Sequence, residues 1–125
     1  MSDGVQRIAD TVRIALDSAD LERFAELLDP RVTWGAPGDP SPPCQNRRQV
    51  IAWYERGRAA GRRAHVQSVS THGDKVLVSM TVTSEDEAEE DTARWQVLTV
   101  ANDRVVDIRG YDDENEAVAA VAEPG

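Results

Sequence analysis

The sequence has few of the residues that mark a disulfide, a metal centre or a membrane span. Cys44 is its only cysteine, so no disulfide can form within the chain. The two histidines, His65 and His72, lack the spacing of a metal-binding motif, and we expect neither a metal nor a cofactor. No apolar run is long enough to span a bilayer, and no secretory signal is visible, which predicts a cytoplasmic protein.

Negative charge dominates, with 23 acidic residues against 14 lysines and arginines and a net charge of −9. A surface of this sign repels polyanions, so we expect binding neither to nucleic acid nor to a membrane. Basic residues nevertheless gather between Arg47 and Arg63, and acidic ones between Glu85 and Asp91. The acidic run is typical of a solvated connection between strands. The arginines form either a solvated helix face or an attraction for an anionic ligand or partner.

The length of 125 residues, 40% of them hydrophobic, predicts a single domain over residues 1–125. Apolar residues at spacings of three and four predict helices near the start of the chain, the second capped by Ser18 or Asp20. The predicted helices are 5–17, 21–28, one that follows the N-cap Asn46 and stops at Gly61, and 113–122.

Alternation with a period of two follows Gly61 and predicts strands. The turn signals His72-Gly73-Asp74 and Asn102-Asp103 separate these strands. The predicted strands are 32–34, 64–71, 75–83, 93–101 and 104–112. Residues 35–43, with four prolines and two glycines, predict a loop.

This order of elements is similar to that of the nuclear transport factor 2-like superfamily, which includes SnoaL-like cyclases, ketosteroid isomerases and limonene-epoxide hydrolases. The segments that carry the resemblance are 18–21, 27–34, 46–51, 95–106 and 109–112. The resemblance covers nearly the whole chain and indicates a bacterial member. It implies an α+β fold of the cystatin-like type, in which a curved antiparallel sheet wraps around the N-terminal helices as a cone with a pocket.

Hairpin geometry assigns side chains to the two sheet faces, because residues opposite one another in an antiparallel pair project to the same side. A two-residue loop at Asn102-Asp103 pairs Thr99 with Val106 and Val97 with Ile108. The predicted concave face holds His65, Gln67, Val69, Val76, Val78, Met80, Val82, Trp95, Val97, Thr99 and Ile108. The predicted convex face holds Leu98, Val100, Val105 and Tyr111 with Gln96, Asp107 and Arg109.

The predicted pocket is mostly apolar with a few polar groups, which is typical of a small-molecule site. His65 and Asp112 are the candidate catalytic residues, as an acid or base beside a substrate carbonyl. The candidate ligand-binding residues are Trp34, Cys44, Trp53, Gln67, Met80, Trp95, Val97, Thr99 and Ile108. The apolar members could equally fill a core, and His65 could be a hydrogen-bonded structural histidine.

The resemblance brings no known catalytic set with it. Ketosteroid isomerases need a carboxylate base, a tyrosine and a protonated aspartic acid, and the matching positions here hold Val12, Trp34 and Val97. The aspartates and arginine of limonene-epoxide hydrolases are also absent from the corresponding positions. A nucleophilic Cys44 is a further hypothesis, because the helix start at Asn46 and nearby arginines would lower the pKa of its thiol.

Two hypotheses of function follow. The first is a pocket protein for a small apolar ligand, either a binder or an enzyme of proton transfer. The second is a non-catalytic interaction module whose cone is filled by its own side chains. Both hypotheses predict a homodimer through the convex sheet face, because an apolar sheet face is rarely left in water.

Overall fold

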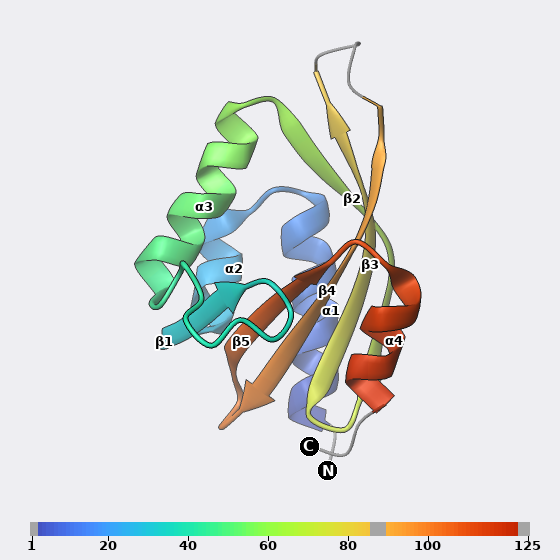
Figure 1. Cartoon of the computed structure of the whole chain (residues 1–125). Coiled ribbons are helices and arrows are strands. Elements are labelled where there is room, and N and C mark those ends of the chain that lie inside the picture. The colour runs from blue at the N-terminus through green and yellow to red at the C-terminus, as the bar shows by residue number, and fades with distance from the viewer. Residues whose placement is uncertain (1–2, 86–89, 123–125) are drawn as a thin grey trace.

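The computed structural model describes residues 3–85 and 90–122. The elements are α1 (Asp3–Asp17), α2 (Leu21–Leu27), β1 (Leu28–Gly35), α3 (Arg47–Ala59), β2 (Arg62–His72), β3 (Lys75–Ser84), β4 (Thr92–Ala101), β5 (Arg104–Tyr111) and α4 (Glu114–Ala122). Figure 1 shows a curved sheet with α1, α2 and α3 on one side and α4 on the other. Most of the predicted acidic connection, residues 86–89, lies outside the described residues. No helix in the described ranges is long and apolar enough to cross a membrane.

Two helix starts are confirmed by their caps. The Asp20 side chain accepts a hydrogen bond from the Arg23 backbone N–H at 3.1 Å, and Asn46 accepts one from Gln49 at 2.9 Å. Each cap satisfies a backbone donor that the first helical turn leaves free. The second helix is shorter than predicted, since Leu28 already belongs to β1.

The sheet has the strand order β1-β5-β4-β3-β2. The four later strands form the predicted antiparallel meander, whereas β1 joins the edge of β5 in parallel. This parallel pairing sets Trp34 of β1 beside Ile108 of β5. Residues far apart in the sequence therefore meet at this edge of the cone.

Both faces of the sheet are packed, and each has its own core. The larger core lies against the three N-terminal helices, with Val12, Phe24 and Val50 fully buried from the helix side. Its buried sheet residues are Leu28, Val32, Val76, Val78, Met80, Leu98, Val100, Val105 and Ile108. The smaller core joins Val97 of β4 to Ala117 and Val121 of α4, with Leu77, Trp95, Tyr111 and Ala120 packed around them.

A register shift in the last hairpin overturns part of the predicted face assignment. The Asn102-Asp103 turn is as expected, and both residues adopt positive φ values of 53° and 62°. The register then shifts between Thr99 and Val100, so that Thr99 pairs with Asp107 and not with Val106. A shift of one residue exchanges the two faces of a strand relative to its partner.

The prediction that Trp95, Val97 and Thr99 face the concave side is therefore wrong. These residues alternate with the inward-facing Gln96 and Leu98, and Val97 and Trp95 pack in the α4 core. The convex assignment of Gln96, Leu98, Val100 and Val105 is wrong for the same reason, because the last three belong to the inner core.

A second register shift reorients the start of β2. Val69 pairs with Val78, one of the two alignments predicted, but the register shifts between Val66 and Ser68. Val66 consequently faces inward opposite Met80, and the inward placement predicted for His65 and Gln67 is wrong. Both project to the outer face, where they contact Thr83 and Thr81 at 3.1 and 3.3 Å.

Candidate functional site

The loop after β1 folds back onto the strand that precedes it. The Trp34 backbone N–H donates to the Cys44 carbonyl at 2.9 Å, and the Cys44 N–H donates to the Trp34 carbonyl at 3.3 Å. A Cβ on Gly35 would lie 2.8 Å from the Cβ of Pro42, so only glycine permits this closure. The loop thereby holds Cys44 beside Trp34 with 4% of its surface exposed.

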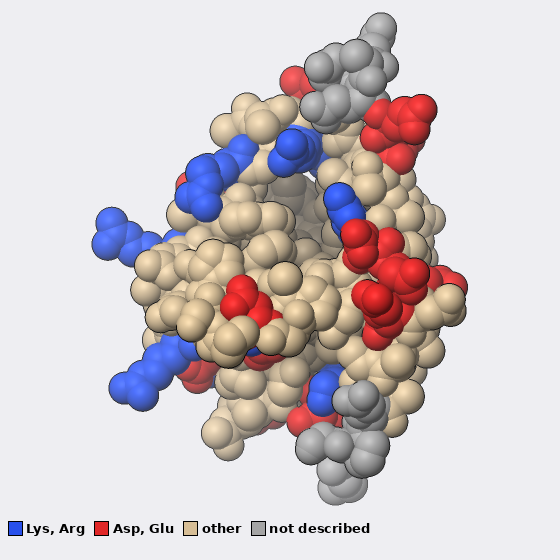
Figure 2. All heavy atoms as spheres, in the orientation of Figure 1, with Lys and Arg blue, Asp and Glu red and all other residues tan. Residues whose placement is uncertain are grey.

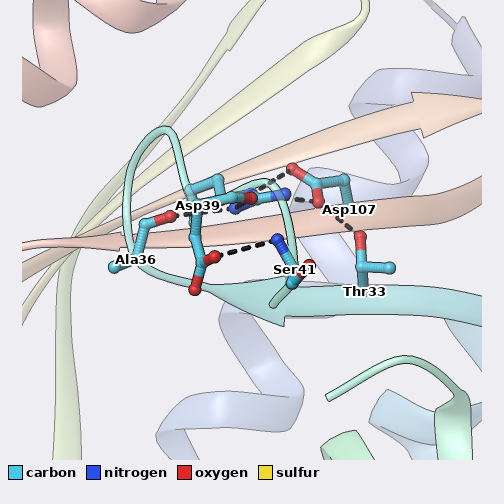
Figure 3. Close-up of polar contacts among 6 residues, drawn as sticks. Thr33, Ala36, Asp39, Ser41 and Asp107 are labelled. Atoms are coloured by element: carbon cyan, nitrogen blue, oxygen red, sulfur yellow. Dashed lines mark hydrogen bonds and ion pairs between the residues drawn. The ribbon is translucent and has the colours of Figure 1, made fainter. Parts of the chain in front are cut away.

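Arg109 holds the tip of this loop from the outer face of β5 (Figure 3). Its Nε donates to both carboxylate oxygens of Asp107 at 3.1 Å, and its Nη1 donates to the carbonyls of Ala36 and Asp39 at 2.9 Å. Asp107 also accepts a hydrogen bond from the Thr33 hydroxyl. This charge-assisted network fixes the loop that positions Trp34 and Cys44.

A row of aromatic rings lies along α3 and ends at β1. Trp34 and Trp53 stack with ring centroids 4.0 Å apart, and Trp53 meets Tyr54 edge-on at 5.2 Å. Tyr54 in turn contacts Phe24 of α2 edge-on at 5.1 Å. Trp53 is 37% exposed, so the row extends from the inner core to the surface.

A polar pair lies within this apolar interior. Gln96 is the only buried polar or charged residue within residues 3–85 and 90–122, and the Tyr54 hydroxyl donates to its Oε1 at 3.0 Å. Gln96 pairs with Gly110 of β5, where a Cβ would lie 3.5 Å from the Trp34 ring. Trp34, Tyr54 and Gln96 therefore converge on one region of the cone.

Burial determines the protonation of the Tyr54 hydroxyl. Desolvation raises the pKa of Tyr54, although the hydrogen bond to Gln96 and the nearby Trp34 N–H oppose the shift. The Trp34 Nε1 itself is buried and forms no hydrogen bond of good geometry within the described part of the chain. Tyr54 is therefore a neutral hydrogen-bond donor at ordinary pH, with Trp34 as a second donor beside it.

The hypothesis of a nucleophilic Cys44 is not supported by the surroundings of its thiol. Burial raises its pKa, and the opposing effect of the Arg56 charge is smaller. The Sγ also donates to the Gln49 carbonyl at 3.7 Å. A protonated, buried thiol is a poor nucleophile, so the geometry favours a structural role.

The interior is open towards the C-terminal half of α3. Gly57 shares a helix face with Val50 and Tyr54, yet a Cβ built on it meets nothing within 4 Å. Figure 2 shows a hollow between α3 and the strands to its right, with basic side chains on its rim. The cone is therefore open beside Gly57, about one helical turn along α3 from Tyr54.

A second hollow lies on the outside of the helices and is separate from this interior. It has a volume of about 430 Å³, opens widely to solvent and is lined by Ala25, Arg47, Arg48, Ile51, Ala52 and Glu55. None of these residues belongs to the Tyr54–Gln96 region, so we do not assign the site to it.

Comparisons with known proteins agree with this architecture. The sequence profile of the SnoaL-like domain matches residues 7–108. The chain belongs to the SnoaL-like domain family. The predicted resemblance to the nuclear transport factor 2-like superfamily and the α+β, cystatin-like fold class are confirmed. None of the curated proteins matches the chain.

Solved structures support the fold of this SnoaL-like domain. A candidate ketosteroid isomerase from Kribbella flavida is 19% identical with a TM-score of 0.73, and the match covers 90% of this chain and 79% of that one. Bal32a, from a soil-derived mobile gene cassette, is 23% identical with a TM-score of 0.72, covering 97% and 100%. A cystatin-fold protein from Novosphingobium aromaticivorans is 12% identical with a TM-score of 0.71, covering 84% and 95%.

The predicted site residues of the SnoaL-like domain divide between its two faces. The inner region brings together Trp34, Cys44, Trp53, Met80 and Ile108. The outer face holds His65, Gln67, Trp95, Val97 and Thr99. Asp112 is exposed directly after β5, two residues beyond the inward-facing Gly110. The catalytic and ligand-binding roles of all these residues stay predictions, and the structure does not bring His65 to the interior.

The sequence did not single out Tyr54 or Gln96 as site residues. The helical spacing that puts Tyr54 on one face with Val50 and Gly57 was a usable signal, since a core-facing hydroxyl needs a partner. Gln96 carried no such signal, because its inward orientation depends on the register shift at Thr99.

Proposed function

We propose that this SnoaL-like domain binds a small, mostly apolar molecule inside the cone, and that the Tyr54 hydroxyl, which in this structure donates its one proton to Gln96 Oε1, turns to donate it to a carbonyl oxygen of that molecule. The buried hydrogen bond between Tyr54 and Gln96 carries the proposal. A few convergent polar groups in an apolar cavity are the usual composition of a small-molecule site. The candidate ketosteroid isomerase among the structural neighbours supports a ligand with a carbonyl group.

The chemistry that these residues support is polarisation of the bound carbonyl. The raised pKa of Tyr54 keeps its proton on the hydroxyl, so the group stabilises negative charge that develops on a ligand oxygen. The Trp34 N–H is a second donor in the same region. Proton abstraction beside the carbonyl also needs a base, and Asp112 at the open end is the predicted residue that we retain for this role.

Native mass spectrometry of protein purified from its own host tests this proposal. We expect a bound small molecule in the wild-type protein. Leucine at Gly57 would fill the open space below α3, so Gly57→Leu should remove the bound mass while the protein stays folded. Ala59→Leu, at an exposed position of the same helix, is the matched control and should keep the ligand. Retention of the ligand in Gly57→Leu would refute an interior site.

A second candidate function is the interaction module with a self-filled cone. The observation in its favour is that the Tyr54 hydroxyl and the Gln96 amide oxygen satisfy one another within the fold. The homodimer stays a proposal, and α4, with Val118 47% exposed, would form part of its convex interface. Sedimentation that shows a dimer, combined with a ligand-free mass spectrum, would support the module over the pocket protein.

A further inference from the structure

An arginine of β4 lies at a position on the inner face of the sheet. Arg94 pairs with Met80 of β3, whose side chain is 4% exposed in the inner core. Two residues further along β4, Gln96 reaches the Tyr54 hydroxyl from the same face. Because side chains of a strand alternate between faces, Arg94 lies on the inner face, nearer the open end than Gln96.

A second arginine has the same orientation on β2. Arg62 pairs with Ser84, and the next inward pair is Ala64 with Val82, both packed against the inner core. The register is regular between Arg62 and Val66, so Arg62 shares their face. Its neighbour Arg63 pairs with Thr83 and projects to the outer face.

Neither of these two arginines has an anionic partner among residues 3–85 and 90–122, which the structure describes. Neither forms an ion pair within the described ranges, where the ion pairs are those of Arg23, Lys75 and Arg109. The hollow in Figure 2 has basic side chains on its rim, although the chain as a whole carries a net charge of −9. Asp112 follows the residue that pairs with Trp95, which puts it near Arg94, but it forms no ion pair with that arginine.

We infer that the cone takes a ligand with an anionic group, most simply a carboxylate, which Arg62 and Arg94 bind at the mouth while the apolar part lies against the inner core. The inference rests on the proposed function, because it names the class of ligand for the same cavity. Guanidinium groups suit this role, since they stay charged and bind a carboxylate through two parallel hydrogen bonds. The overall negative charge of the protein repels anions at long range. The attraction for the anionic group must therefore come from direct contact with these two side chains.

A matched pair of probes separates the anionic group from the apolar body. We would measure binding of naphthalene-2-carboxylate and of its methyl ester by isothermal titration calorimetry, in the wild-type protein and in Arg62→Gln, Arg94→Gln and Arg63→Gln. We expect the carboxylate to bind more tightly than the ester. Each inner-face substitution should weaken the carboxylate about three- to tenfold and leave the ester unchanged. Arg63→Gln is the control and should change neither.

Three outcomes would overturn the inference. Equal affinity of the two probes shows that no charge is recognised, and equal effects of Arg63→Gln and Arg94→Gln show that the rim has no specific role. If the two probes bind equally and Gly57→Leu abolishes the binding of both, the proposed function survives while the anion inference fails. If neither probe binds at millimolar concentration, the interior site itself is contradicted, and the inference falls with it.

Discussion

Replacing Tyr54 by phenylalanine tests the central contact of the site, because it removes one hydroxyl and keeps the ring. The edge-on contacts with Phe24 at 5.1 Å and Trp53 at 5.2 Å do not involve the oxygen. What changes is Gln96, whose buried Oε1 loses its donor at 3.0 Å. An unpaired buried acceptor costs about 1–3 kcal/mol of folding free energy, which corresponds to a lower melting temperature of roughly 3–5 °C per kcal/mol at this chain length.

A double-mutant cycle isolates the pair from its surroundings. Gln96→Leu leaves the Tyr54 hydroxyl unpaired and should cost a similar amount, about 1–3 kcal/mol. The double variant leaves no buried group unpaired, so its loss should be smaller than the sum by about 1–2 kcal/mol. The free energies of unfolding come from urea denaturation followed by circular dichroism.

The control for this cycle is the exposed Gln67 on the outer face of β2. Gln67→Leu should change stability by less than about 0.5 kcal/mol, and its combination with Tyr54→Phe should be additive. If Tyr54→Phe and Gln96→Leu are also additive, the two side chains do not interact in solution. The inner face of β4 would then be misassigned, and the proposed site with it.

Three further predictions follow from the same contacts. Burial raises the pKa of Tyr54 above its ordinary value of 10.0, so the contribution of the neutral hydroxyl to stability is complete below pH 10 and declines above it. The free energy of unfolding should therefore fall less steeply with alkaline pH in Tyr54→Phe than in the wild type. The Cys44 thiol should react with Ellman's reagent at least ~10-fold more slowly in the folded than in the urea-unfolded protein, and Arg56→Gln should slow it further. Arg109→Leu should expose residues 36–41 to limited proteolysis and cost about 1–3 kcal/mol, whereas Arg104→Leu at the exposed hairpin should do neither.

Local signals in the sequence were sufficient for the elements and their order. Apolar spacing, the caps Asp20 and Asn46, and the turn at Asn102-Asp103 each have a local cause, and all of them are present in the structure. The parallel pairing of β1 with β5 has no local cause, because it joins segments about 75 residues apart and depends on how the helices close the cone. The contact between Trp34 and Ile108 follows from that closure.

The faces of the strands were predicted less well, because two register shifts have no clear signature in the sequence. Alternation normally shows which face of a strand is buried, but β4 is apolar on both faces: Leu98 faces the helices and Val97 faces α4. A displacement by one residue therefore changes little in the hydrophobic pattern. The turn gave the correct pairs next to it, and the error begins at Thr99.

The register shifts nevertheless determine the chemistry of the cone. With the unshifted register, the interior would contain His65 and Thr99, and a histidine base would be the natural mechanism. The observed register exchanges them for Gln96 and, at the mouth, Arg94. The interior then has two neutral hydrogen-bond donors, the Tyr54 hydroxyl and the Trp34 N–H, and positive charge at its rim. This arrangement favours binding an anionic carbonyl compound and polarising its carbonyl over removing a proton from it. An activity that persists in His65→Gln and disappears in Tyr54→Phe would support this distinction, and the reverse result would restore the histidine mechanism.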